Sequence, residues 1–198
     1  MATSIIKTDE IRRLNDQVLM SDGALTSDVQ FPAGHVIQVV QNNFADNTVY
    51  SGGTVFPSFT EVTEATTSIT VKGNNSRIYM MYAIAFGTVS DNMTVWRIKE
   101  NTTLLPVGNT ISPGRAGVGF TGNEHYTPGQ YNLLGFNYNY LQQTTSSIGD
   151  TLTYYLELSN RGTDAKEIRL NSPQLYTSWG DNNTHTSRSS VILMEIAT

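Results

Sequence analysis

The sequence predicts an all-β domain made of two antiparallel sheets, as in a jelly roll or sandwich. Thr (26), Ser (17) and Asn (17) are abundant among the 198 residues, and Thr, with 10 Tyr and 7 Phe, favours half-buried strands. The 16 Gly, together with Asn and Ser, favour turns between strands. Several short stretches alternate between apolar and polar residues, and the strand–helix alternation of a parallel nucleotide-binding sheet is not visible.

Residues 1–30 differ from the rest and are predicted to form an arm. Charged residues are frequent there and apolar residues sparse. The spacing of Ile11, Leu14 and Val18 fits one face of a helix, whereas residues 15–16 (Asn-Asp) equally fit a turn between two strands, so both structures stay open. The arm has too little apolar surface for its own core. We expect it to attach to another protein through Ile5, Ile6, Ile11, Leu14 and Val18.

The body, residues 31–198, begins with strands bounded by turn residues. Residues 35–41 follow Pro32 and Gly34, and residues 68–72 end at a Gly-Asn-Asn-Ser turn. The next alternating strand, 77–86, places five apolar side chains on its core face. These side chains are Ile78, Met80, Tyr82, Ile84 and Phe86.

The opposite face of residues 77–86 is apolar as well, so this strand is predicted to be covered on both sides. Tyr79 and Met81 would leave an exposed apolar patch unless a neighbour covers it. We therefore expect Tyr79, Met81 and, on a later strand, Tyr155 at a contact between copies of the chain. The alternative cover is another strand or loop of the same chain.

Later elements follow the same alternation. Residues 93–99 lead through a turn at 100–101 into 102–106, and the glycine-rich stretch 109–129 is predicted to be a long loop. Residues 173–185 are predicted to be a second, polar loop. The remaining predicted strands, each with an apolar face, are 134–140, 150–158, 168–170 and 190–197.

Motifs that would carry chemistry are sparse. Residues 117–122 match G-x-G-x-x-G, but no helix can open after them, so a phosphate cradle is disfavoured and a surface loop is expected. His35, His125 and His185 lie far apart without metal-ligand spacing, and Glu61 and Glu64 are better explained as solvated residues than as an acid–base pair. With no cysteine and no G-x-S-x-G motif, we expect a protein that is not an enzyme and uses neither metal nor cofactor.

Charge excludes further classes of partner. The formal net charge is −5 with only 12 Lys and Arg, which argues against nucleic acid or a polybasic membrane contact. No stretch approaches the roughly 18 apolar residues of a membrane helix, and no secretion signal is recognisable. We therefore expect a soluble chain without membrane insertion.

Aromatic residues in the predicted loops suggest a binding role. Tyr126, Tyr176 and Trp179 are bordered by Asn and Asp, which suits a glycan because a flat ring packs on the sugar C–H face and amides bind hydroxyls. The other interpretation is that Trp179 plugs the end of the sandwich and the tyrosines line a subunit contact.

Five phrases of the sequence, in their order, resemble fibre-type structural proteins of tailed bacteriophages, in particular those of cyanobacterial and marine phages. The resemblance covers most of the chain, and its specificity lies in the order of the phrases and in the last one. The phrases are residues 5–11, 34–41, 76–82, 95–101 and 191–197.

This resemblance implies a trimeric jelly roll similar to the C1q and tumour-necrosis-factor lobes, attached to a virion by the N-terminal arm. It implies no cofactor and no catalytic residue. The chain has no long shaft, so a capsid-decorating or cement trimer and a small head or tail fibre are both expected roles. A carbohydrate-binding lobe that recognises host glycan is the alternative, and a polysaccharide-degrading enzyme ranks third.

Overall fold

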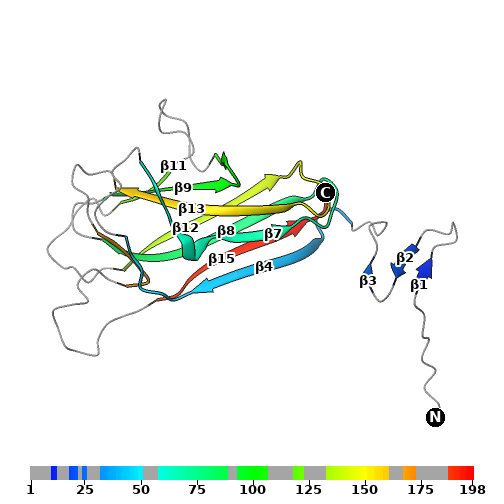
Figure 1. Cartoon of the computed structure of the whole chain (residues 1–198), viewed down its shortest axis with the longest axis horizontal. Coiled ribbons are helices and arrows are strands. Elements are labelled where there is room, and N and C mark those ends of the chain that lie inside the picture. Colours follow the sequence, from blue (N-terminus) through cyan, green and yellow to red (C-terminus); the bar gives the residue numbers. More distant parts are fainter. Residues whose placement is uncertain are drawn as a thin grey trace, which may run out of the picture.

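The protein is described by a computed structural model that covers most of the body and three short strands of the arm (Figure 1). The described segments are 10–12, 18–21, 24–25, 32–50, 58–88, 93–106, 118–122, 133–160, 167–172 and 187–198.

The arm contains a small antiparallel sheet of its own. It consists of β1 (Glu10–Arg12), β2 (Val18–Ser21) and β3 (Ala24–Leu25), and Ile11 of β1 pairs with Met20 of β2. Of the two structures left open by the sequence, the strands are therefore the ones observed. Ile11 and Val18 lie on these strands, whereas Ile5, Ile6 and Leu14 lie outside the described residues.

The first body sheet, called here the β8 sheet, has four long antiparallel strands in the order β4–β15–β8–β12. Two short strands, β14 and β5, continue it beside the end of β8. Its strands are β4 (Val36–Phe44), β5 (Val49–Tyr50), β8 (Arg77–Thr88), β12 (Leu133–Gln143), β14 (Ile168–Leu170) and β15 (Ser189–Ile196).

The second body sheet, the β13 sheet, has two long strands at its centre and short strands at both edges. β9 (Met93–Glu100) pairs with β13 (Thr151–Asn160). Beside β9 lie β10 (Thr103–Leu104) and β11 (Val118–Gly122), and beside β13 lie β6 (Thr60–Glu61) and β7 (Thr67–Thr70). A 3-10 turn, η1 (Thr63–Ala65), joins β6 to β7.

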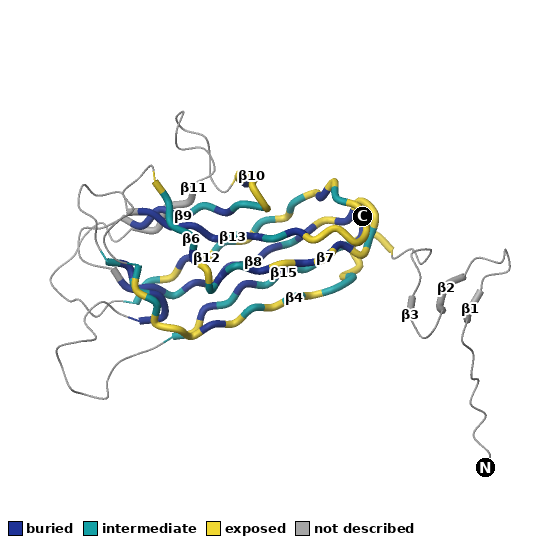
Figure 2. The backbone as a smooth tube through the Cα atoms, in the orientation of Figure 1, coloured by how far each residue is buried: buried dark blue, intermediate teal, exposed yellow. Residues whose placement is uncertain are grey.

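The core lies between the two sheets, and buried residues alternate with more exposed ones along the described strands of the body (Figure 2). Trp96 is completely buried at its centre, stacked on Phe136 at 5.0 Å and edge-on to Phe86 at 5.1 Å. The stacked row continues along β12 through Tyr138 to Tyr140. The predicted core rows are confirmed: Ile78, Met80, Tyr82, Ile84, Phe86, Leu152, Tyr154, Leu156 and Leu158 are all buried.

The all-β, antiparallel, two-sheet prediction is thus confirmed. One local prediction is wrong: residues 118–122, expected within a long loop, form β11, which pairs in register with β9 from Val118–Arg97 to Gly122–Met93. The G-x-G-x-x-G match therefore lies mostly on a strand, where backbone groups are used in pairing instead of being free to cradle phosphate. The strands β5 and β6 were not anticipated, because two residues carry no periodic signal.

The body has two unlike ends. At one, called here the termini end, short turns connect the strands, and backbone hydrogen bonds join Gly34 to Ala197 and Ala197 to His35, each 2.8 Å long. The chain therefore enters the body from the arm beside its own C-terminus (Figure 1). At the far end β4, β8, β11 and β13 finish and β9, β12, β14 and β15 begin.

Candidate functional site

The outer face of the β8 sheet carries an apolar row that crosses four neighbouring strands. Backbone pairing aligns Val39 of β4 with Met194 of β15, Met194 with Tyr79 of β8, and Tyr79 with Leu141 of β12. Val39 is 54% exposed and Leu141 is 44% exposed, and the two residues between them are half-buried. An apolar row of this width on a solvent-facing side is typical of a surface that another molecule covers.

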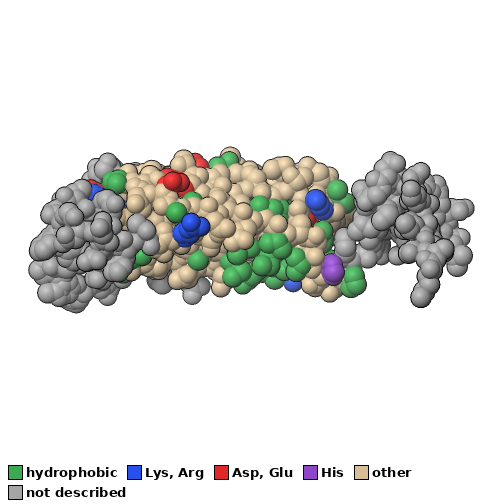
Figure 3. All heavy atoms as spheres, turned by 90° about the horizontal axis from the view of Figure 1, so that it is seen from below, with side chains coloured by type: hydrophobic (Ala, Val, Ile, Leu, Met, Phe, Trp, Pro, Cys, Tyr) green, Lys and Arg blue, Asp and Glu red, His purple; other side chains and the backbone are tan. Residues whose placement is uncertain are grey.

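The two rows that follow toward the far end contain no charged side chain, whereas the row on the other side, toward the termini end, includes Arg77. One aligns Gln41, Ile192, Met81 and Asn139. The next aligns Asn43, Ser190, Ala83 and Asn137. Figure 3 views the side on which β4 lies in Figure 1, and hydrophobic side chains gather in one part of this side. We call these three rows the outer β8 face.

Two of the three residues predicted at a contact between copies therefore lie on one surface. Tyr79 and Met81 are both on the outer β8 face, half-buried by their neighbours. Tyr155 lies on β13 opposite Lys99 and alternates with the core residues Tyr154 and Leu156, so it faces outward from the other sheet. The structure does not bring Tyr155 to the same surface as the other two.

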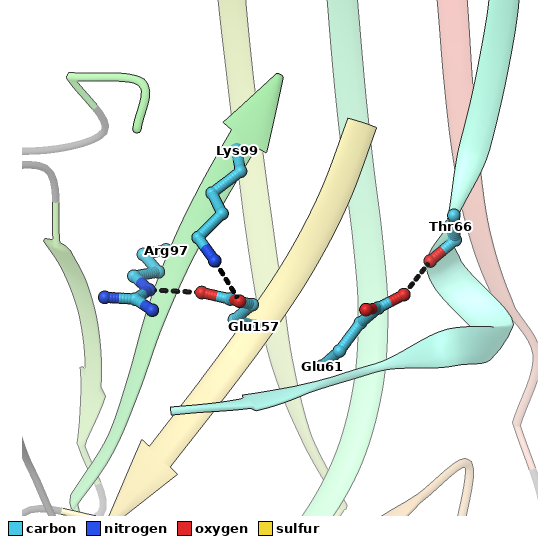
Figure 4. Close-up of polar contacts among 5 residues, drawn as sticks. All are labelled: Glu61, Thr66, Arg97, Lys99 and Glu157. Atoms are coloured by element: carbon cyan, nitrogen blue, oxygen red, sulfur yellow. Dashed lines mark hydrogen bonds and ion pairs between the residues drawn. The ribbon is translucent and has the colours of Figure 1, made fainter. Parts of the chain in front are cut away.

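The outer face of the β13 sheet carries a compact charged cluster (Figure 4). Arg97 and Lys99 of β9 both contact the carboxylate of Glu157 on β13, with Lys99 Nζ 2.6 Å from Oε1. The guanidinium of Arg97 lies over the ring of Phe59, 3.9 Å from its centroid. The Glu157 side chain is only 10% exposed, so this pairing compensates a carboxylate largely removed from water.

A second carboxylate lies directly across the strands. Glu61 of β6 pairs in register with Glu157, and its Oε1 accepts a hydrogen bond from Thr66 Oγ1 at 2.8 Å. Like charges at opposed positions repel, and the two cations on Glu157 offset that repulsion. The cluster ties β9, β13 and β6 together, and its carboxylates already have partners.

Glu64, which the sequence paired with Glu61 as a conceivable acid and base, is engaged elsewhere. It accepts hydrogen bonds from the hydroxyls of Thr48 and Tyr50, the latter at 2.6 Å. Burial would raise the pKa of Glu64, but these hydrogen bonds outweigh it and lower the pKa below the usual 4.5. Burial and the hydrogen bond to Glu64 raise the pKa of Tyr50 in turn. These hydrogen bonds join Thr48 and Tyr50, at β5, to Glu64 in η1.

A buried carboxylate at the termini end was missed by the sequence reasoning. Glu195 is fully buried, and it accepts hydrogen bonds from Gln38 Nε2 (2.6 Å), Ser76 Oγ (2.7 Å) and the backbone N–H groups of Lys72 and Gly73. The alternation of residues 190–197 was the available signal, since it places Glu195 on the same face as Val191 and Leu193. The four donors hold β15 against β4 and the turn after β7.

The predicted glycan contacts Tyr126, Tyr176 and Trp179 lie outside the described residues, as do His125 and His185. His35 lies at the entry to β4 and is exposed. Within the described segments, no three His, Asp or Glu side chains come together as a metal site would require. The same part of the chain contains no helix long and apolar enough to cross a membrane.

No protein-family model matches the chain, and no curated protein matches it in sequence. Several solved structures resemble it, among them chains of infectious bursal disease virus. One from the Gx strain has 11% identity and a TM-score of 0.39, over 81% of this chain and 37% of that one. One from the T13 viral particle has 12% identity and a TM-score of 0.40, over 96% and 41%.

A third similar chain comes from the VP2 subviral particle of the same virus, with 12% identity and a TM-score of 0.31, over 95% of this chain and 47% of that one. This chain therefore spans less than half the length of these similar chains. Those chains are parts of viral particles. Such identities and TM-scores transfer no residue role to the present protein.

Proposed function

We propose that this protein is a non-enzymatic structural component of a virus particle. Within that role we propose a homotrimer that decorates or cements the capsid of a tailed bacteriophage, or forms a small head or tail fibre. Residues 1–30 serve as the attachment arm, and residues 31–198 form the jelly-roll body. The partners are other copies of the chain and a capsid or tail protein.

The observation that carries this proposal is the outer β8 face. In a chain of net charge −5, three adjacent rows across four strands carry no charged side chain, and the middle of this surface is Met194, Tyr79, Ile192 and Met81. Covering these side chains removes apolar area from water, which contributes about 25 cal/mol per Å². Repeated copies of one chain supply that cover most simply, as in a virion component present in many copies.

Tyr79 and Met81 are the residues that we propose at the contact between copies, because both lie on the outer β8 face. Tyr155 faces outward from the β13 sheet, on the other side of the sandwich, so a contact through the outer β8 face does not include it.

The position of the arm supports attachment at the termini end. Gly34 and His35 are hydrogen-bonded to Ala197, so the arm departs from a fixed point of the body. In a cyclic trimer whose axis runs along the strands, three arms leave at the same end and bind one particle together. Binding through three linked arms gains avidity over binding through one.

Deletion of residues 1–30 tests this division of labour. The truncated body is expected to keep its β-sheet circular dichroism and its trimer mass, and to lose binding to particles from which the protein has been removed. Full-length protein rebinds in the same experiment. An unfolded truncated body, or undiminished particle binding, would contradict the proposal.

A carbohydrate-binding role is the second candidate, and one topological observation favours it. The segment with Tyr126 lies between β11, which finishes at the far end, and β12, which begins there. The segment with Tyr176 and Trp179 lies between β14, which pairs with the last three residues of β8, and β15, which begins beside Phe44 at the end of β4. Both segments are therefore attached opposite the arm, where a host-surface glycan would be met.

Trp179→Ala tests this role on a glycan array. If the aromatic residues form the site, binding is lost while the mass of the oligomer stays unchanged. Tyr155→Ala, on the outer face of the β13 sheet, is the matched aromatic control and should retain glycan binding. Equal binding by the Trp179→Ala variant and the unaltered protein would remove these residues as the site.

A further inference from the structure

The β8 sheet ends in two long strands whose outer edges have no partner among the described residues. β4 pairs only with β15, and β12 pairs only with β8. β4 has 9 residues and β12 has 11, so each presents a row of unpaired backbone N–H and C=O groups. The edges of the β13 sheet are built differently, from strands of 2 to 5 residues.

The two long edges carry few of the devices that usually prevent strand addition, and the one that is present is a register shift at the start of β4, between Val36 and Gln38. Natural edge strands are protected by Lys, Pro, bulges or short length. β4 (VIQVVQNNF) and β12 (LLGFNYNYLQQ) contain no charged residue and no proline. The pairing of β12 with β8 runs from Leu133 to Gln143 without a register shift, so this strand has no bulge. Such an edge is suited to pairing with another strand.

The two edges fit each other in direction. β4 is antiparallel to β15, β15 to β8, and β8 to β12, so β4 and β12 run in opposite directions on opposite sides of one sheet. When copies are related by an axis along the strands, β12 of one copy and β4 of the next are therefore antiparallel. Antiparallel strands form the more stable ladder of hydrogen bonds.

We propose that the β12 edge of one copy pairs with the β4 edge of a neighbouring copy, so that the β8 sheet continues from chain to chain. This inference rests on the self-association proposed above and names its hydrogen-bonding surface. Both free edges are used in every copy, and three copies close a ring of strands. The outer β8 faces then face the ring axis, where their uncharged rows meet one another without Coulomb repulsion.

Hydrogen exchange of the full-length protein tests the pairing. In a free edge strand, every second amide points to solvent and exchanges quickly, whereas in an interior strand all amides are protected. We expect all β4 and β12 amides to be protected at concentrations where sedimentation gives an oligomer. On dilution, alternate amides of both strands should become fast over the same range in which the mass falls.

Paired charge substitutions supply an independent check. Gln41 and Asn139 lie in the same row at the two edges of the sheet, three strand spacings or about 14 Å apart within one copy. Edge pairing that keeps the two residues in one row places Gln41 of one copy near Asn139 of the next. Gln41→Lys with Asn139→Lys should weaken self-association about tenfold, and Gln41→Glu with Asn139→Lys should restore it.

The matched control is Asn47→Lys with Asn74→Lys, which adds the same charges at exposed turn positions. It should leave self-association unchanged. Circular dichroism of each variant checks that it is folded. If a variant is unfolded, hydrogen exchange of the unaltered protein remains the test of edge pairing.

The outcomes separate this inference from the proposed function. An oligomer whose β4 and β12 keep fast alternate amides would retain self-association and overturn edge pairing. Protection that persists in a monomer would show that the chain's own segments cover the edges, which also overturns it. A monomer with fast alternate amides at every concentration would overturn both proposals.

Discussion

The Oε1 atom of Glu195 accepts a hydrogen bond of 2.7 Å from the backbone N–H of Gly73, which lies 122 residues earlier in the chain. A Cβ atom at Gly73 would lie 3.4 Å from the same oxygen, which is an ordinary contact, but only 2.5 Å from Ile37 Cδ1, so the absence of a side chain leaves room for Ile37. The hydrogen bond fixes the last strand to the turn after β7 at the end where the arm enters.

Replacing Glu195 with Gln is expected to destabilise the fold. The carboxylate is fully buried and receives only donors, so an amide nitrogen in its place would face N–H or O–H groups. A loss of about 2–3 kcal/mol in the free energy of unfolding follows for hydrogen bonds to a charged group. Urea denaturation measures it, with Asp46→Asn at an exposed position as the control; equal midpoints would contradict the role of Glu195.

Gly149→Ala is expected to cost about 1 kcal/mol through backbone conformation alone. Gly149 has φ +95°, and a Cβ atom added there would meet no other atom within 4 Å, so strain and not collision is the cause. Gly135→Ala on β12 is the comparison, since its backbone is in the strand region and its nearest contact is a movable Asn137 side chain. The midpoint of thermal unfolding should fall for the Gly149→Ala variant and stay unchanged for the Gly135→Ala variant.

Two buried tyrosines should respond oppositely to loss of the hydroxyl. The Tyr82 hydroxyl is buried without a hydrogen-bond partner among the described residues, so Tyr82→Phe should keep or raise stability, by up to about 1 kcal/mol. The Tyr154 hydroxyl donates to Glu100 at 2.9 Å, so Tyr154→Phe should lower stability by a similar amount. Chemical denaturation of the Tyr82→Phe and Tyr154→Phe variants measures both changes in stability. A Tyr82→Phe variant less stable than the unaltered protein would show that the Tyr82 hydroxyl has a hydrogen-bond partner.

Acid should remove the contribution of Glu64 to stability. Its pKa is lower in the folded chain than the usual 4.5, so its stabilisation is fully present above that pH and is lost as the pH falls through the folded value. The difference in unfolding free energy between the unaltered protein and Glu64→Gln should therefore be constant near neutrality and shrink below pH 4.5. A difference that stays constant into acid would contradict the ionised state assigned to Glu64.

The fold was predictable from the sequence where core-facing and outward-facing side chains alternate over many consecutive residues. Residues 77–86 and 150–158 alternate over enough positions to define their core faces, and those side chains are buried as expected. The glycine-rich residues 118–122 lacked such a period, because their strand character depends on pairing with β9 and not on their own side chains.

The candidate site was predictable only in part. Tyr79 and Met81 follow from alternation, since they lie opposite a core row. The apolar row also needs Val39, Met194 and Leu141, which come from three other strands and become neighbours only through register. Strand order between distant segments is set by the packing of the whole chain, so no local pattern could have assembled this surface.

Self-association through the outer β8 face is decided by sedimentation equilibrium of the full-length protein at micromolar concentration. We predict a mass three times the 21.8 kDa of one chain, and a smaller mass when Tyr79 and Met81 are both replaced by Lys. A mass of 21.8 kDa for the unaltered protein would contradict trimer formation, since the apolar row would then remain open to water in solution.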